Sequence, residues 1–278
     1  MIHIRTFEDI KEVISGQDPV PMTIVNPKGD YIFSALNEAE SLGWIVPNIL
    51  QFSNEYEAAK LGVQTIREGK SHLMMKGDID TATLMRAVLN SKSGIRTDHR
   101  VSHIAVVESW YYPRLMILSD GGVNALQPPE VLESMIFNCV AMANKLGIDQ
   151  PRVAMLSLVE KVTETVPETK VARDLVVKFK DHPGFIIEGP LALDVASSRK
   201  AALAKKIDSQ IAGKTDIFIG PNITTINFMV KALMNLGGAR AGGIISGAQV
   251  PIVLLSRSDS METRLNSIAL GLLALKGE

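Results

Sequence analysis

Short apolar segments alternate along the chain with longer segments in which apolar residues recur every three or four positions. Short runs rich in β-branched residues predict strands, and longer periodic segments predict helices. The expected strands are 22–26, 72–76, 103–108, 115–119, 153–157, 185–187, 217–220 and 252–256. The expected helices are 30–41, 54–69, 80–91, 128–146, 168–181, 194–211, 222–236 and 259–275. This alternation indicates an α/β fold with a mainly parallel sheet covered by helices.

One pair of expected strands departs from the parallel pattern. Only the six residues SWYYPR separate 103–108 from 115–119. A parallel connection needs a crossover of a dozen or more residues, so these two strands are expected to pair as an antiparallel hairpin.

Charge and composition narrow the classes of function. Lysine and arginine number 29 and aspartate and glutamate 30, for a net charge of −1, which argues against a nucleic-acid partner. The longest uncharged stretch, 241–256, contains Gly, Gln, Ser and Pro and is too short to predict a membrane helix. The first twelve residues lack the apolar core of a secretory signal, and Cys139 is the only cysteine. A cytoplasmic location is therefore expected.

The most informative segment is the last expected strand and the helix after it. Ser256 and Arg257 stand at the carboxyl end of that strand, where open α/β sheets bind ligands. Asp259 and Glu262 fit a capping box, and this role is favoured over catalysis for both. A hydroxyl, a guanidinium and a helix amino terminus together suit phosphate or another oxyanion. An ion pair between Arg257 and a surface carboxylate fits the pattern equally well.

A second strand-to-helix turn has a similar composition. Lys76 ends the strand, Asp80 or Thr81 caps the helix, and Arg86 follows about one and a half turns later. Lys76 or Arg86 would suit an anion, although Arg86 also fits a solvent-exposed helix face.

Other candidate positions favour structural roles. Asp120, before Gly121 and Gly122, is interpreted as part of a tight turn, and Asp194 as a helix cap. Cys139 is interpreted as a core residue. The glycines of 237–243 do not satisfy the dinucleotide-binding spacing, 67–71 is not a P-loop, and no nucleophile elbow or metal-ligand pattern is present.

Several segments, taken in order, resemble the phosphate acetyltransferase and phosphate butyryltransferase family. They are TATLMRA at 81–87, SDGGVN at 119–124, RVAMLS at 152–157, EGPLALD at 188–194, DIFIGPNITTINFMVKAL at 216–233 and PIVLLSRSDSMETRLNSIAL at 251–270. The last is the most specific, and the resemblance runs from about residue 70 to the end. It implies a two-domain α/β/α sandwich like that of isocitrate and isopropylmalate dehydrogenases, with the active site in the interdomain cleft. The implied domains are 1–104 with 245–278, and 105–244.

The resemblance also implies a reaction. Acyl-CoA and phosphate would be interconverted with acyl phosphate and coenzyme A, with no metal, nicotinamide or other cofactor. Ser256 and Arg257 would be catalytic, stabilising the transition state and binding phosphate, and Arg86 would bind the phosphate side of the substrates. The other substrate-binding candidates in the matching segments are Thr81, Lys76, Asp194, Asn227 and Lys231. A homo-oligomer, commonly built on a dimer, is implied as well.

Two departures from the acetyl branch matter. Thr263 stands where the acetyl enzymes place an aspartate thought to be the base toward the thiol, and a neutral hydroxyl is a poor base, so the base is unassigned. Gly121 stands where they carry a cysteine, which favours the butyryl branch and acyl groups such as butyryl or isobutyryl. The alternatives are a noncatalytic acyl-CoA or phosphate sensor, and a metal- and nicotinamide-dependent dehydrogenase, for which no cluster of aspartates is evident.

Overall fold

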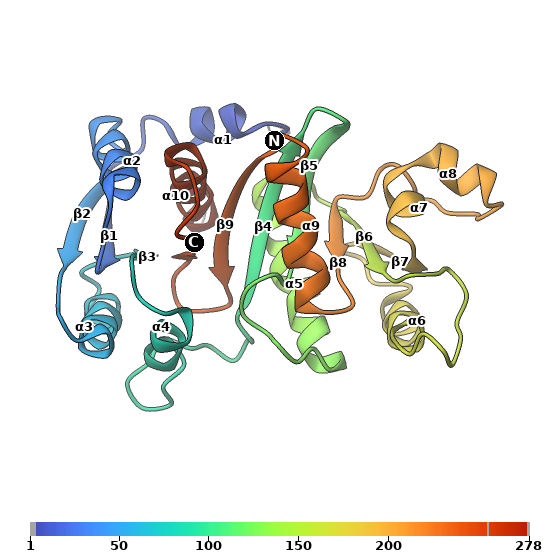
Figure 1. Ribbon diagram of the computed structural model, residues 1–278, viewed down its shortest axis with the longest axis horizontal. Coiled ribbons are helices and arrows are strands. Elements are labelled where there is room, and N and C mark those ends of the chain that lie inside the picture. The colour runs from blue at the N-terminus through green and yellow to red at the C-terminus, as the bar shows by residue number, and fades with distance from the viewer. Residues whose placement is uncertain (1–3, 255, 277–278) are drawn as a thin grey trace. The chain divides into compact units, whose positions relative to one another are not determined.

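A computed structural model describes residues 4–254 and 256–276. Its chain divides into two compact units (Figure 1). Residues 7–101 and 241–276 form one, called the terminal unit, and residues 4–6 and 102–240 form the other, called the middle unit. The expected boundaries were 104/105 and 244/245. The structure divides the chain three or four residues earlier at each, and Ile4 belongs to the middle unit because its N–H donates to the carbonyl of Leu146 (3.2 Å).

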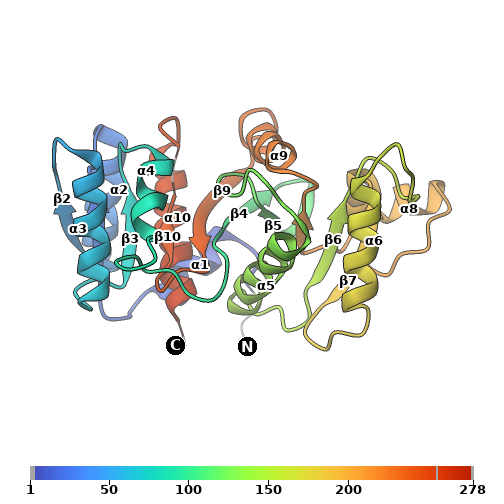
Figure 2. The same cartoon turned by 90° about the horizontal axis from the view of Figure 1, so that it is seen from below.

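The terminal unit is built on strands in the order β2-β1-β3-β10-β9, of which only β9 runs antiparallel to its neighbour β10. Its elements are α1 (Phe7–Ile14), β1 (Val20–Val25), α2 (Asp30–Ser41), β2 (Ile45–Leu50), α3 (Glu55–Arg67), β3 (Leu73–Lys76), α4 (Thr81–Val88), β9 (Arg240–Ser246), β10 (Ile252–Val253) and α10 (Met261–Leu275). Helices α3 and α4 pack together on one face of these strands (Figure 2), and α1, α2 and α10 pack together on the other. Strands β1 and β3 are thus buried between two helical layers, which is why their runs are almost wholly apolar.

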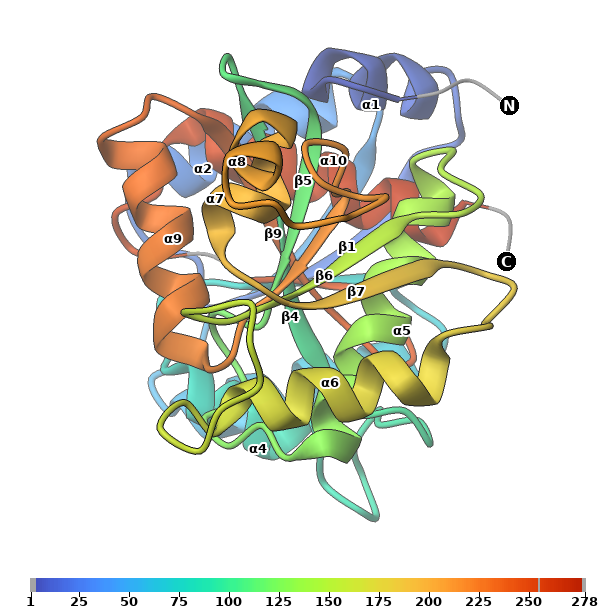
Figure 3. The same ribbon diagram turned by 90° about the vertical axis from the view of Figure 1, so that its right-hand side faces the viewer.

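The middle unit has the strand order β4-β5-β8-β6-β7. Its elements are β4 (Ser102–Ser109), β5 (Tyr112–Ser119), α5 (Pro129–Lys145), β6 (Arg152–Leu156), α6 (Glu168–Phe179), β7 (Ile186–Leu191), α7 (Leu193–Ser197), α8 (Arg199–Ala204), β8 (Ile217–Ile219) and α9 (Ile223–Asn235). Strands β4 and β5 form the predicted antiparallel hairpin, and the other pairs are parallel. Figure 3 shows α5 and α6 on one side of the strands and α7 and α8 on the other.

A buried charge joins three strands of the middle unit. Asp216, fully buried just before β8, accepts hydrogen bonds from Arg114 Nη1 of β5 (2.7 Å) and from the backbone N–H of Arg152 in β6 (2.9 Å). Both arginine side chains also pair with it. A carboxylate removed from water needs such partners to keep its charge, so this cluster holds the strand starts in register.

The single cysteine lies in the core of the middle unit. Cys139 is fully buried on α5, and burial raises the pKa of its thiol to about 12. The predicted core position is therefore confirmed.

The α/β class and the hairpin are confirmed, whereas several elements differ from expectation. Strand β2 was not predicted because Pro47 interrupts its pattern, and it lies at the end of the strand order, where proline costs no ladder bond. Strand β9 was missed because it contains two glycines, one of which is required by packing: a Cβ at Gly242 would lie 2.8 Å from Leu270 Cδ1 of α10. Helix α1 was missed as well.

The expected helix 194–211 is wrong in its extent. It breaks at Ser198, whose extended backbone ends α7 and whose side chain accepts from the N–H of Ala201 to cap α8. In the ranges that the structure describes, none of the helices has the length and apolar character needed to span a bilayer.

Candidate functional site

Lys76 ends β3 at the edge where the parallel strands β1, β3 and β10 all have their carboxyl ends. Only 6% of the residue is exposed, and its ammonium donates to the carbonyl of Gly77 (3.2 Å). Burial lowers the pKa of Lys76, and the nearby charge of Arg257 lowers it further. An anion bound beside these two cations would favour the charged form of Lys76 and so oppose both causes of the lowered pKa. The strand edge is therefore suited to binding phosphate.

Arg257 lies beside this lysine and is paired with a carboxylate. Its Nε is 3.0 Å from Oδ1 of Asp78, and Lys28 Nζ approaches Oδ2 of the same aspartate at 3.6 Å. The ion pair that fitted the sequence pattern is therefore present. A guanidinium has five N–H donors, and the side chain is 81% exposed. The guanidinium is therefore accessible to a ligand.

Ser256 begins a compact turn that is held by hydrogen bonds to the side chains of Asp259 and Arg264. Its N–H donates to Oδ2 of Asp259 (2.7 Å), and its hydroxyl lies 3.1 Å from that of Ser258. Arg264, only 7% exposed, donates to the carbonyls of Ser256 (3.2 Å), Arg257 (3.4 Å) and Asp259 (3.2 Å). Sequence reasoning missed Arg264, although an arginine next to a run of apolar helix positions was a signal that it would be buried and bonded.

The predicted capping box at the start of α10 is wrong. The helix begins at Met261, and its N-cap is Ser260, whose hydroxyl accepts from the N–H of Thr263 (3.1 Å). The carboxylate of Asp259 binds the Ser256 turn instead. The Thr263 hydroxyl lies 3.1 Å from that of Ser260 and belongs to the cap.

Helix α4 starts at the same strand edge. Asp80 is its N-cap, as one of the two predicted alternatives had it, and accepts from the N–H groups of Ala82 (2.9 Å) and Thr83 (3.2 Å). Thr81 is the first helical residue. Arg86 is exposed, and its guanidinium carbon lies 5.9 Å from the centre of the Tyr56 ring of α3.

The other predicted site residues belong to the middle unit. Asp194 lies in the first turn of α7 and does not cap it, because the N-cap is Ala192. Its carboxylate accepts from Lys205 Nζ (2.9 Å), and this bond lowers its pKa. Asn227 and the exposed Lys231 lie on α9, which packs on β4 and β5, whereas Asp194 follows β7. Two strands separate β5 from β7, so Asp194 and the α9 residues occupy different parts of this unit.

The turn after β5 matches the interpretation of Asp120. Its buried carboxylate accepts from the N–H groups of Gly122 (2.7 Å) and Val123 (2.9 Å). Asn227 Nδ2 donates to the carbonyl of Gly121 (2.8 Å) and so ties α9 to this turn. A Cβ at Gly121 would lie 3.1 Å from Ile226 Cγ2, so a side chain there would require Ile226 to move by a few tenths of an ångström.

The structure thus brings Lys76, Ser256 and Arg257 to one edge of the terminal unit, with Thr81 at the start of α4. Two cations and a hydroxyl suit the binding of an oxyanion. Within 4–254 and 256–276, no group of three or more His, Cys, Asp or Glu side chains is arranged to hold a metal ion.

Comparisons with known proteins were made on the sequence and on the fold. A family model described as "Phosphate acetyl/butaryl transferase" matches residues 19–272. The phosphate butyryltransferase of Clostridium acetobutylicum is 40% identical over 230 residues, which cover 81% of this chain and 75% of that protein. The phosphate acetyltransferase of Thermotoga maritima is 38% identical over 230 residues, covering 82% and 78%. A branched-chain phosphotransacylase from Enterococcus faecalis V583 aligns with a TM-score of 0.84 and 27% identity, over 92% of this chain and 98% of that one.

Proposed function

The chain belongs to the phosphate acetyl/butyryl transferase family, and we propose that it interconverts a short-chain acyl-CoA and phosphate with acyl phosphate and coenzyme A. The observation that carries this proposal is the strand edge of the terminal unit, where the buried ammonium of Lys76 and the guanidinium of Arg257 lie beside Ser256. These groups match the charge of phosphate and of an acyl phosphate.

The reaction proceeds by attack of a phosphate oxygen on the thioester carbonyl. Arg257 and Lys76 hold the phosphate by charge-assisted hydrogen bonds and orient it toward the carbonyl carbon. The carbonyl oxygen becomes an oxyanion, which the hydroxyl of Ser256 stabilises by donating a hydrogen bond. Collapse of this intermediate breaks the carbon–sulfur bond and releases the coenzyme A thiolate, which then takes up a proton. The reverse reaction follows the same steps with the thiolate as nucleophile.

Other residues complete the proposed site. Arg86 and Thr81 of α4 bind the phosphate side of the substrates, whereas substrate-binding roles for Asp194, Asn227 and Lys231 rest on the family resemblance alone. The reaction needs no metal or nicotinamide. We further assign the two units to the fold of the isocitrate and isopropylmalate dehydrogenases, and propose a cytoplasmic homo-oligomer.

The preferred acyl group is butyryl or a branched chain of similar size. The names of the butyryl relative and of the branched-chain structure support this preference. Gly121 also supports it, because the acetyl enzymes carry a cysteine at this position. A pocket discriminates one methylene by only about 1 to 3 kcal/mol, so neighbouring acyl lengths are accepted as well.

The test is phosphate-dependent release of thiol from acetyl-, propionyl-, butyryl-, isobutyryl- and valeryl-CoA. Activity should peak beyond acetyl, and Arg257→Ala should lower kcat and raise the KM for phosphate. Arg173→Ala is the matched control, because Arg173 lies on the surface of α6 and pairs with its neighbour Asp174. If the chain binds coenzyme A but releases no thiol from any thioester, the acyltransferase is excluded and the noncatalytic sensor takes its place.

A further inference from the structure

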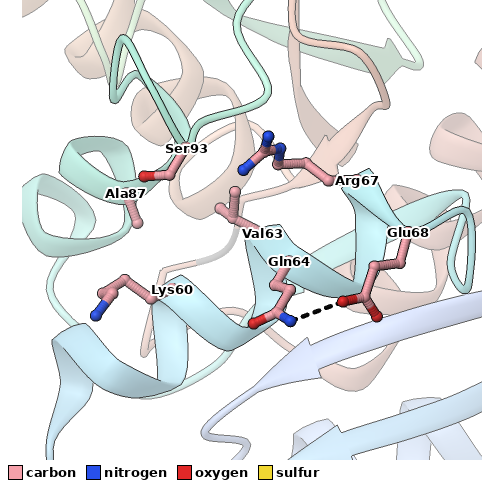
Figure 4. Close-up of a pocket in the computed structure, with 7 residues that line it drawn as sticks. All are labelled: Lys60, Val63, Gln64, Arg67, Glu68, Ala87 and Ser93. Carbon is pink, nitrogen blue, oxygen red and sulfur yellow. Dashed lines mark hydrogen bonds between the residues drawn. The ribbon is translucent and has the colours of Figure 1, made fainter.

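The terminal unit holds its arginine side chains in two different ways. Arg67 of α3 is exposed, and its guanidinium extends over a pocket of about 400 Å³ between α3 and the end of α4 (Figure 4). Arg264 of α10 is only 7% exposed, and its Nε and Nη2 atoms donate to backbone carbonyls. Burial of a charge is costly unless an opposite charge compensates it, so the position of Arg264 requires an explanation that the exposed Arg67 does not.

The charge of Arg264 is not balanced by a carboxylate in the part of the chain that the structure describes. No ion pair joins it to another side chain there, and the carboxylate of Asp259 binds the N–H of Ser256 instead. Burial lowers the pKa of Arg264 and the charge of Asp259 raises it, yet a guanidinium stays charged in proteins. Helix α10 begins at Met261, so this cation also lies close to a helix amino terminus, where the helix dipole disfavours it. Its local surroundings therefore do not account for the charge.

The charge of Arg264 acts on the other cations of the strand edge. Burial lowers the pKa of Lys76, and the positive charges of Arg257 and Arg264 lower it further. All three cations are therefore stabilised by an anion at this edge. A phosphate dianion in contact with Lys76 and Arg257 would supply the opposite charge that Arg264 lacks.

The hydrogen bonds of Arg264 also fix the direction of the peptide groups in the turn. Nη2 donates to the carbonyls of Ser256 (3.2 Å) and Arg257 (3.4 Å), and both peptides that follow are trans. The N–H and C=O of a trans peptide point in opposite directions, so the N–H groups of Arg257 and Ser258 point away from the Arg264 guanidinium. Neither N–H has a hydrogen-bond partner among the described residues. The turn therefore presents two backbone donors on the side opposite Arg264, where an anion can accept from them.

Resting on the acyltransferase function proposed above, we propose that Arg264 is a positioning residue of the phosphate site. It acts without touching phosphate. Its hydrogen bonds hold the Ser256 hydroxyl and the two N–H groups toward the ligand, and its buried charge attracts the anion. The charge therefore governs the affinity for phosphate, whereas the hydrogen bonds govern kcat, because Ser256 must face the carbonyl oxygen of the substrate.

Calorimetric titration with inorganic phosphate and steady-state release of thiol separate these two effects. Arg264→Gln removes the charge and should weaken phosphate binding about tenfold, the effect of one charge acting through protein on a nearby dianion. Arg264→Lys keeps the charge but lacks the planar fork that spans the turn. Its Kd for phosphate should stay within about threefold of the unmodified value, while kcat falls about fivefold, as for a lost hydrogen bond. Arg173→Gln, on the surface of α6, should change neither quantity.

The assignment is overturned if Arg264→Gln and Arg264→Lys weaken phosphate binding equally. It is also overturned if both variants lower Tm and leave the Kd for phosphate unchanged, because Arg264 would then only support the fold. If Arg264→Gln does not fold, Arg264→Lys decides the question: retained phosphate affinity with a lowered kcat supports the assignment, and lost affinity overturns it. A chain that binds phosphate but releases no thiol would refute the acyltransferase, and the phosphate titrations would still decide the role of Arg264.

Discussion

Nε of Arg257 lies 3.0 Å from Oδ1 of Asp78, although the arginine side chain is 81% exposed. An ion pair with such an exposed arginine contributes little to stability. We therefore expect it to change the affinity for phosphate instead. The Asp78 carboxylate neutralises part of the charge that Arg257 offers to phosphate.

Asp78→Asn should therefore lower the KM for phosphate, by about threefold, because a neutral amide competes less for the guanidinium. Tm should change little. Steady-state kinetics at varied phosphate concentration measure the effect, with Asp174→Asn as the control at an exposed aspartate that also pairs with an arginine. A rise in the KM for phosphate would instead mean that Asp78 orients Arg257 for binding.

Lys76→Met should stabilise the protein by about 1 kcal/mol at pH 7 while abolishing most activity, because it removes a buried charge that the ligand-free site leaves weakly compensated. Chemical denaturation and thiol release measure the two effects. Lys92→Met, at an exposed loop position, should change stability by less than about 0.5 kcal/mol.

The stability effect of Lys76→Met should depend on pH. The pKa of Lys76 is lowered in the folded chain, whereas an unfolded lysine titrates near 10.4. At pH values between the folded pKa and the unfolded pKa, the unfolded chain therefore binds more protons than the folded chain. The stability of the unmodified protein relative to the variant should therefore rise with pH through this window. The advantage of the variant, largest at neutral pH, should shrink toward pH 10, and an advantage that grows over that range would contradict the prediction.

Asp216→Asn should lower the free energy of unfolding by about 3 kcal/mol, because it leaves Arg114 and Arg152 beside a neutral amide in place of their shared carboxylate. Urea denaturation measures this loss. Asp174→Asn, whose pair with Arg173 is exposed, should cost less than about 0.5 kcal/mol, and equal effects would show that the buried cluster contributes no more than a surface pair.

Ser260→Ala and Asp259→Ala should separate stability from catalysis. Loss of the Ser260 cap should cost about 1 kcal/mol of stability, whereas loss of the Asp259 carboxylate should mainly lower kcat, because it frees the N–H of Ser256. Denaturation and thiol release on both variants test this. If Asp259→Ala leaves kcat unchanged, the turn does not position Ser256.

Elements that are determined by neighbouring residues in the sequence were predicted correctly. The apolar run of β3 and the Asp80 cap of α4 needed no distant contact to be recognised. Strand β9 could not be predicted, because its glycines are explained only by the approach of α10. The cap of α10 was misassigned since Asp259 and Ser260 are equally good caps in isolation, and the choice depends on the backbone of Ser256.

Part of the candidate site followed from strand positions in the sequence. Lys76 ends β3 as predicted, whereas β10 ends at Val253, so Ser256 and Arg257 lie in the turn that follows the strand and their catalytic roles stay a prediction. The sequence signalled that Arg264 would be buried, but its bonding partners could not be predicted because they are backbone carbonyls of the turn. The pocket beside Arg67 was missed because it depends on how α3 packs against α4.

Because Cys139 is buried, the folded chain should not react with thiol reagents. A fully buried thiol whose pKa is about 12 is neither accessible nor ionised at neutral pH. Every thiol counted with native enzyme therefore comes from coenzyme A. Because the chain has a single cysteine, unfolding releases one reactive thiol per molecule, so the same reagent reports how much of a preparation is unfolded.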